Sequence, residues 1–196
     1  MGGHAFPRLH CPRMPRDVYL KIREQATEAL SKLFAHVVVP TEMPDKVDYG
    51  DIDILVSGFF STTSNTSDNW PAMVTAISSG FNTTHCQRGF LNPSIIFSAI
   101  PAGGEKDFWV QIDVKVLEKE DEQTFAWNQF QLNYASGSKM LGSLIKPLGM
   151  TIGPEGLHIR VEELEQTNFP GSMVFVSKEP WYVIFVFTTT VFSRRD

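Results

Sequence analysis

The chain contains little cysteine, with only Cys11 and Cys86 among its 196 residues. Two thiols cannot form a disulfide framework or a four-ligand zinc site, so the fold depends on its apolar core. Basic residues are also too few to balance the acidic ones, since 17 Lys and Arg stand against 22 Asp and Glu. The net charge of −5 argues against a broad, non-specific nucleic-acid surface, although a small basic patch inside a cleft remains compatible with it.

Long hydrophobic runs are missing as well. The longest apolar tract, 181–192, has 12 residues, whereas a membrane span needs about 20. The first residues show no apolar signal-peptide core, so we expect a cytoplasmic or nuclear protein with no membrane partner. The chain has no Gly-x-Ser-x-Gly motif, which argues against the nucleophile elbow of an α/β-hydrolase.

The remaining composition is typical of a folded domain, with 42% apolar and 20% charged residues. Apolar residues recur at helical spacing over 16–34, 70–80, 123–134 and 139–148. Residues 67 and 68 are candidate caps of the second helix. Alternation and β-branched residues predict strands at 37–39, 51–56, 94–100, 108–117 and 157–161, and β-branched and aromatic residues dominate 173–192. We therefore expect an α/β (α+β mixed) fold, with a small, mostly antiparallel mixed sheet and helices on one face.

Three carboxylates form the most informative pattern. Asp51 and Asp53 are two residues apart in a predicted strand, so both side chains point to the same sheet face. Like charges at this spacing repel unless a cation lies between them. Asp113 occupies the middle of another apolar strand and either faces solvent or joins the first two. Three such carboxylates can hold two Mg²⁺ ions together with a nucleoside triphosphate.

The simplest alternative is an unrelated α/β domain in which Asp-x-Asp decorates an exposed strand. Gly50, directly before the pair, favours the metal interpretation because glycine permits a close backbone approach. The alternative predicts that Asp113 lies far from Asp51. The sequence alone leaves both interpretations open.

The motif Gly50-Asp51-Ile52-Asp53, preceded by Val38-Val39-Pro40-Thr41 and followed by Gln111-Ile112-Asp113-Val114, resembles the nucleotidyltransferase superfamily of DNA polymerase beta. Weaker similarity to uncharacterised fungal and phage members extends over residues 2–14, 153–157 and 175–180. The resemblance implies a nucleotidyltransferase-like domain at 1–187 and a tail at 188–196. It also implies that the C-terminal helical part of the relatives is missing here.

The function implied by this resemblance is Mg²⁺- or Mn²⁺-dependent transfer of a nucleotidyl group from an NTP to a hydroxyl. Asp51 and Asp53 would bind both ions, and Asp113 would bind the catalytic ion and help to deprotonate the acceptor. The acceptor stays open among an RNA end, a small molecule and a protein side chain.

The chain departs from the family where Pro40-Thr41 replaces a Gly-Ser pair whose backbone N–H groups hold the triphosphate. Proline has no N–H to donate, so an inactive domain that binds nucleotide or a protein is the alternative function. Thr41 can still offer a hydroxyl, and a loop containing Gly2 and Gly3 is a candidate substitute.

Further phosphate contacts are candidates in both halves of the sequence. Ser138 and Lys139 can meet phosphate at a helix N-terminus, although an ordinary cap explains them equally. Arg13 and Lys46 are candidate phosphate contacts or simply solvated charges. Tryptophans at 70, 109 and 127 can stack on a base or fill the core.

Overall fold

The computed structural model describes residues 3–60, 69–103, 107–118 and 121–192. The chain forms two compact units, Met1–Glu120 and Asp121–Asp196, called unit 1 and unit 2 below. The sequence analysis places one domain at 1–187 and a tail from 188. Helix α5 (Pro180–Phe192) runs across that expected boundary, so the chain has no structural break at residue 188.

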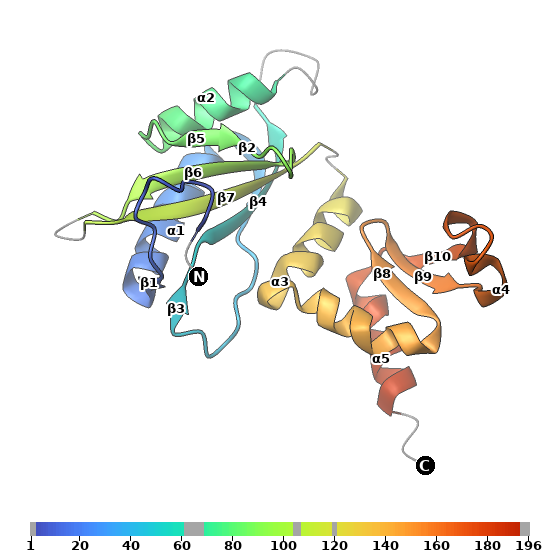
Figure 1. Ribbon diagram of the computed structural model, residues 1–196. Coiled ribbons are helices and arrows are strands. Elements are labelled where there is room, and N and C mark those ends of the chain that lie inside the picture. The colour runs from blue at the N-terminus through green and yellow to red at the C-terminus, as the bar shows by residue number, and fades with distance from the viewer. Residues whose placement is uncertain (1–2, 61–68, 104–106, 119–120, 193–196) are drawn as a thin grey trace. The chain divides into compact units, whose positions relative to one another are not determined.

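Unit 1 contains a five-stranded mixed sheet and two helices (Figure 1). Its elements in chain order are β1 (Met14–Pro15), α1 (Arg16–Ser31), β2 (Phe34–Val38), β3 (Asp48–Tyr49), β4 (Ile52–Phe59), α2 (Trp70–Gly80), β5 (Cys86–Arg88), β6 (Ile95–Pro101) and β7 (Trp109–Leu117).

The strand order in the main sheet is β2-β4-β7-β6-β5. Strands β4 and β7 are parallel, and the other neighbouring pairs are antiparallel. Parallel neighbours need a long crossover connection, which here contains α2, β5 and β6. The mixed α/β fold with mainly antiparallel pairing that the sequence predicts is thus confirmed.

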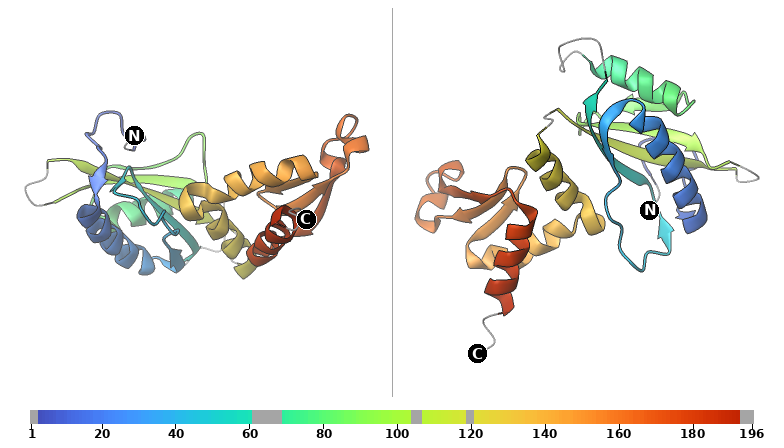
Figure 2. Two further views of the ribbon diagram at one scale, coloured as in Figure 1. Left: turned by 90° about the horizontal axis from the view of Figure 1, so that it is seen from below. Right: turned by 180° about the vertical axis from the view of Figure 1, so that it is seen from behind.

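Both helices of unit 1 cover the same face of the sheet (Figure 2, left). Ile52, Ile54 and Val56 of β4 join the buried core with residues of α1 and α2. Because side chains alternate along a strand, Asp53 of β4 and Asp113 of β7 belong to the opposite face. The N-terminal residues also lie on that second face (Figure 2, left).

Helix α1 is shorter than the apolar spacing predicts. It ends at Ser31, and Phe34 opens strand β2, where it pairs with Phe59. The predicted helix bound at 34 is therefore wrong. Leu33 and Phe34 continue the helical pattern only because both are needed by the core, and periodicity cannot separate a buried helix end from a buried strand start.

The strands predicted at 94–100 and 108–117 are confirmed as β6 and β7. They pair antiparallel as a hairpin, with Ile100 opposite Val110. Strand β5 was not predicted, because three residues are too few to show alternation. The proposed caps at residues 67 and 68 lie outside the described residues, and Asn69 precedes helix α2.

Unit 2 has its own buried core, formed by Trp127, Ile145, Leu157 and Val183. Its elements are α3 (Glu122–Ile145), η2 (Lys146–Leu148), β8 (Met150–Gly153), β9 (Gly156–Arg160), α4 (Glu162–Glu165), η3 (Pro170–Ser172), β10 (Met173–Ser177) and α5 (Pro180–Phe192). Strand β9 pairs antiparallel with both β8 and β10.

Helix α3 joins the two helices predicted at 123–134 and 139–148. A sharp kink separates its halves, because Asn133 is extended and the next three residues have left-handed backbone conformations. Tyr134, Ala135 and Ser136 have φ values of 55°, 54° and 63°. Left-handed conformations are costly for residues with a Cβ, so this turn stores strain.

Residues 180–192 form helix α5, although β-branched and aromatic side chains dominate them. Pro180 stands at the first helical position, where its missing N–H costs nothing. The hydroxyls of Thr188 and Thr189 donate to the carbonyls of Ile184 and Phe185, one turn earlier. In the described part of the chain, no helix combines the length and hydropathy needed to cross a membrane.

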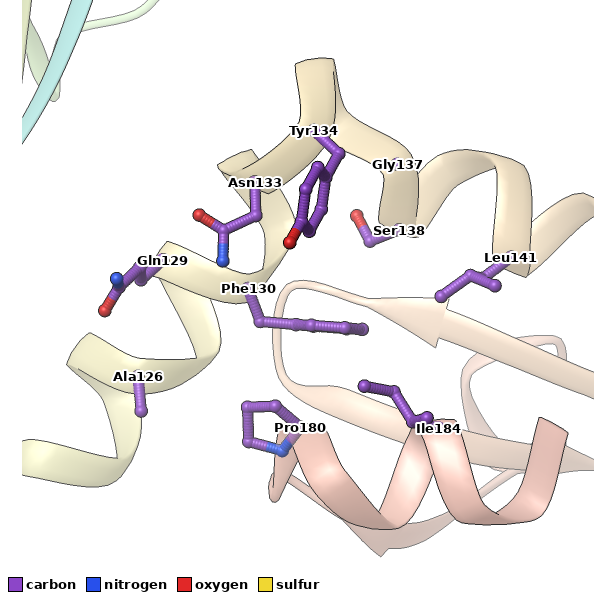
Figure 3. Close-up of a pocket in the computed structure, with 10 residues that line it drawn as sticks. All are labelled: Ala126, Gln129, Phe130, Asn133, Tyr134, Gly137, Ser138, Leu141, Pro180 and Ile184. Carbon is purple, nitrogen blue, oxygen red and sulfur yellow. The ribbon is translucent and has the colours of Figure 1, made fainter. Parts of the chain in front are cut away.

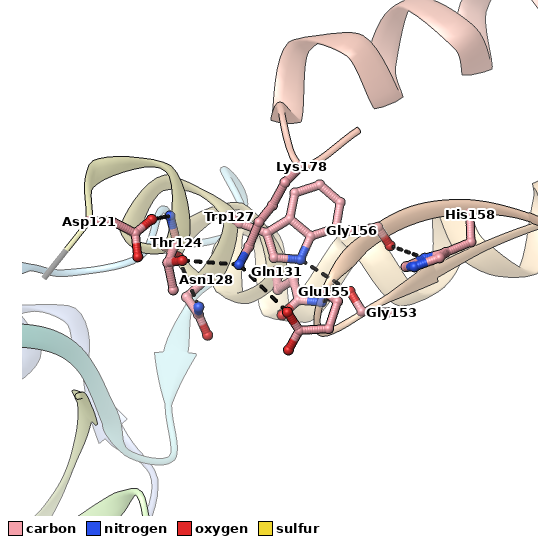
Figure 4. A network of polar contacts seen from close by, with 10 residues as sticks. All are labelled: Asp121, Thr124, Trp127, Asn128, Gln131, Gly153, Glu155, Gly156, His158 and Lys178. Carbon is pink, nitrogen blue, oxygen red and sulfur yellow. Dashed lines mark hydrogen bonds and ion pairs between the residues drawn. The ribbon is translucent and has the colours of Figure 1, made fainter. Parts of the chain in front are cut away.

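A polar network fastens the β8–β9 turn to helix α3 (Figure 4). Trp127 Nε1 and Gln131 Nε2 both donate to the Gly153 carbonyl, at 3.1 and 2.9 Å. Lys178 Nζ donates to Thr124 Oγ1 at 3.0 Å. These bonds engage the side chains of Thr124, Trp127 and Gln131 on helix α3, so the network has a structural role.

Candidate functional site

The parallel pairing of β4 and β7 brings two of the three candidate aspartates together. Asp53 and Asp113 are direct partners in the register of this pair. Adjacent strands are about 4.8 Å apart, so the two side chains are neighbours on one sheet face. Asp51 lies two residues before Asp53, just ahead of β4. The sheet thus places the Asp-x-Asp motif next to Asp113, unlike a decorative motif far from it.

Burial raises the pKa of each of these carboxyl groups, and the negative charge of a neighbouring carboxylate adds to the rise. Desolvation is the main cause for Asp113, whose pKa rises to about 7 despite a hydrogen bond from Gln111 that favours the anion. The pKa of Asp53 rises to about 6, first by desolvation and then by the negative charge of Asp51. Asp51 shows a rise for the same first reason.

The two partners differ in their exposure to solvent. Asp53 is exposed by its surface area and Asp113 is only half-buried, so water screens the charge of Asp53 more effectively. Lysines temper the repulsion, since the positive charges of Lys46 and Lys115 act on Asp53 in the opposite sense.

The donor chemistry of this cluster fits Mg²⁺, which prefers carboxylate oxygens. The aspartates nevertheless do not form a ready-made cage: among the described residues, no three His, Cys, Asp or Glu side chains gather closely enough to hold one ion. Carboxylates that repel each other separate until a cation is present. A divalent ion would have to draw these groups inward.

The start of the chain lies across the carboxylate face as a strap, defined here as residues 3–5. The Gly3 N–H donates to the Gly50 carbonyl at 3.1 Å, and the Ala5 N–H donates to Gln111 Oε1 at 2.8 Å. Gln111 Nε2 in turn donates to Asp113 Oδ1 at 2.7 Å. The strap therefore fixes the amide that holds the third carboxylate.

Only glycine fits at position 3 of the strap. A Cβ built there would lie 2.3 Å from Gln111 Oε1 and 2.4 Å from its Cδ. Such distances are far below normal contact, so a larger residue has to displace either the strap or the glutamine. The predicted phosphate loop at Gly2-Gly3 is described only from Gly3 onward, whose N–H is bonded to Gly50.

Beside the strap lies a cavity of about 510 Å³. Its wall is formed by the strap, by β5 and the turn that follows it, by β6, by β7 and by Asp51. The lining includes His4, Asp51, Arg88, Phe90, Phe97 and Gln111. The cavity thus opens next to the first aspartate of the motif.

The expected phosphate segment follows β2. Pro40 is buried and Thr41 is exposed. Lys46 Nζ and Glu42 Oε2 form an ion pair at 2.6 Å within this segment. Gly50 is buried, and its carbonyl accepts the hydrogen bond from the strap.

The other candidate phosphate contacts differ in their surroundings. Ser138 belongs to unit 2, where its buried hydroxyl donates to the Gln131 carbonyl at 3.1 Å. Lys139 follows it in the second half of α3 and is exposed. Arg13 in unit 1 pairs with Asp48 at 2.8 Å, and its positive charge also acts on Asp51.

The tryptophans are chiefly structural. Trp127 is fully buried in the core of unit 2, and Trp70 is buried under the Arg88 guanidinium, 3.8 Å from its ring centre. Trp109 packs edge-on against His85. The core interpretation therefore holds for Trp70 and Trp127.

A second cavity, of about 600 Å³, lies in unit 2 at the kink of α3 (Figure 3). Phe130, Tyr134 and Leu141 of α3 face Pro180 and Ile184 of α5 across it. Its walls are mainly apolar, and no carboxylate lines it among the described residues. It offers packing surface for an apolar group.

Sequence reasoning missed Gln111, Lys115 and Glu42 as neighbours of the aspartates, and it named Lys46 only as a candidate phosphate contact. Gln111 and Lys115 flank Asp113 at two-residue spacing, so strand alternation already places them on its face. Glu42 and Lys46 act on the cluster from the segment before β3. No local pattern indicates that contact, because it depends on how the connecting segment folds back.

The comparisons add no relative to this geometry. A scan against protein-family models finds no match, and a search of curated proteins finds none either. The functional argument therefore depends on the sheet face itself.

Proposed function

We propose that the chain is a divalent-metal-dependent nucleotidyltransferase that moves a nucleotidyl group from an NTP to a hydroxyl acceptor. The observation that carries the proposal is the register of β4 and β7, which sets Asp53 beside Asp113, with Asp51 two residues earlier. Three repelling carboxylates on one face are costly unless the face binds cations.

Each aspartate has a defined part in this proposal. Asp51 and Asp53 would hold two Mg²⁺ or Mn²⁺ ions, and Asp113 would be a further ligand of one of them. When bound, the ions lower the pKa of the acceptor hydroxyl and neutralise the leaving pyrophosphate. The acceptor oxygen then forms a bond to the α-phosphorus while the bond to pyrophosphate breaks. Asp113 would accept the hydroxyl proton as the general base of this step.

Phosphate contacts come from the segment after β2 and from the lysines near the cluster. Thr41 is exposed at the position of the family's phosphate turn, and Lys46 is close enough to influence Asp51 and Asp53. A lysine acts as a point charge for phosphate. Pro40 offers no N–H, so we expect weaker triphosphate binding than a Gly-Ser turn would give.

The test is stabilisation of the folded chain by Mg²⁺ together with an NTP. Ligand binding to the folded state raises the melting temperature by mass action. We expect this rise in the wild type and its loss in Asp53→Asn. Asp107→Asn, a substitution of an exposed aspartate in the same unit, should respond like the wild type. Equal stabilisation of Asp53→Asn and the wild type would remove the basis of the proposal.

The second candidate is a domain of this type that binds nucleotide or a protein without catalysis. Pro40-Thr41, in place of a donor-rich turn, favours it. Pyrophosphate release separates the two functions, because only the enzyme releases it from NTP. The double substitution Pro40→Gly and Thr41→Ser should tighten NTP binding in either case if this turn holds the phosphates. Unchanged affinity would assign the phosphates to another segment.

A further inference from the structure

The cavity beside Asp51 is bounded mostly by segments other than the expected phosphate segment. Besides Asp51, its wall comes from the strap, from β5 and the turn after it, from β6 and from β7, and none of its lining residues belongs to 40–49. In nucleotidyl transfer, the attacking and leaving oxygens lie roughly in line on opposite sides of the phosphorus. A phosphate site at 40–49 therefore leaves this cavity on the acceptor side of the carboxylates.

An exposed aromatic side chain stands at the rim of the cavity. Phe90 is 96% exposed although it lines the cavity, and Phe97 of β6 lines it from within. A phenylalanine so fully in water has lost most of the free energy that burial would provide. Its position beside a cavity makes it a surface for a flat ligand to cover.

The turn that carries Phe90 is held firmly. The Gly89 N–H donates to the Ile95 carbonyl at 2.8 Å, and the Ile95 N–H donates to the Asn92 carbonyl at 3.0 Å. Arg88 Nε donates to the Pro93 carbonyl at 2.6 Å. The ring is thus presented by a preorganised turn, which lowers the entropy cost of binding.

The polar groups of the cavity suit the edges of a base and the hydroxyls of a sugar. His4 and the Gln87 side chain line the same space as the rings. Asp51 provides carboxylate oxygens, which accept hydrogen bonds from hydroxyl groups. Aromatic faces with polar edge contacts are the usual surroundings of an unstacked nucleobase.

We propose that this cavity binds the acceptor, and that the acceptor is a nucleoside whose base covers Phe90 and whose sugar hydroxyls point toward Asp51. The inference rests on the proposed function for the identity of the reacting hydroxyl. The same chemistry occurs in a free nucleoside and at the 3′ end of an RNA strand.

The test measures binding of the four ribonucleosides and of a five-nucleotide RNA to the full chain by calorimetry in EDTA. Without metal, binding does not depend on the carboxylates holding ions, so it can succeed even where nucleotidyl transfer fails. We expect saturable binding that Phe90→Ser weakens about tenfold, since stacking on one ring contributes at this scale.

Two control variants make the comparison specific. Leu91→Ser removes an apolar side chain of the same turn that is 87% exposed and does not line the cavity, and it should bind like the wild type. Phe90→Tyr keeps the ring and should retain affinity. Both are judged on samples with wild-type circular dichroism, and Asp53→Asn should bind nucleosides normally.

Each result of this binding experiment either supports or overturns the proposal. No saturable binding, unchanged affinity in Phe90→Ser, or an equal loss in Leu91→Ser would overturn the proposal. Displacement of the nucleoside by Mg²⁺ with a non-hydrolysable NTP would overturn the acceptor assignment, because donor and acceptor must bind together. Tighter binding of the RNA than of its terminal nucleoside supports a strand end, and equal binding supports a free nucleoside.

Discussion

At the scale of single residues, the carboxyl pair of β4 and β7 sets how stability depends on pH. The folded-state pKa values of Asp53 and Asp113, about 6 and about 7, exceed the ordinary value of 3.8. At a pH between the ordinary and the raised pKa values, the folded state binds more protons than the unfolded state. The contribution of the pair is therefore complete below pH 4 and is lost as the pH rises through 7.

We accordingly expect Asp113→Asn to reduce the loss of stability between pH 5 and pH 8. An amide cannot titrate, so the substitution removes the proton that the folded state must release. Urea unfolding at the two pH values measures the difference, with Asp107→Asn as the unperturbed comparison. A lower stability of Asp113→Asn at pH 8 would instead identify the carboxylate as a structural acceptor for Gln111.

The strap provides a second prediction at this scale. Gly3→Ala places a Cβ within 2.3 Å of Gln111 Oε1, so the strap should detach and the Ala5 amide should lose its protection from hydrogen exchange. The free energy of unfolding should fall by about 1–3 kcal/mol, as expected for the loss of the two hydrogen bonds that Gly3 and Ala5 donate.

Gly80→Ala is the matched control for the strap variant. A Cβ at position 80 meets its nearest atom, in Leu33, at an ordinary 3.6 Å, so the change should leave Ala5 protected. Unaltered protection of Ala5 in both variants would show that Gly3 is not required for the strap.

At the scale of elements, the kink in α3 stores strain that a glycine can release. Ala135→Gly should stabilise the protein by about 1 kcal/mol, because glycine adopts the left-handed conformation without a Cβ clash. Ala126→Gly, in the regular first half of the same helix, should cost about 1 kcal/mol. Thermal or urea unfolding measures whether each change stabilises or destabilises the protein. Destabilisation by both changes would contradict a strained turn.

Elements also show how far the sequence predicts the fold. The β6–β7 hairpin was predictable because its strands are long and alternate clearly. Strand β5 was not predictable, since three residues carry no periodicity. Helix α5 was not predictable either, because its β-branched residues favour a strand and packing in unit 2 outweighs that preference. The Asp-x-Asp motif indicated the site, whereas the strap became visible only through the hydrogen bond from Ala5 to Gln111.

At the scale of the whole molecule, the two units have separate cores and should respond separately to core substitutions. Ile145 is fully buried in the core of unit 2, and truncation to alanine should cost about 2–5 kcal/mol there. Ile54, in the core of unit 1, should keep its amide protection in Ile145→Ala. Hydrogen exchange measures both, and equal loss of protection in the two units would show that they unfold as one.

The strap bond between Ala5 and Gln111 joins residues 106 positions apart, and it closes on the strand that carries Asp113. Loop closure over such a distance is entropically costly and belongs to the slow steps of folding. During synthesis, the last carboxylate therefore reaches its neighbours only after nearly all of unit 1 has been made. Incomplete chains are consequently kept from assembling the acidic face, and the site matures together with the finished sheet.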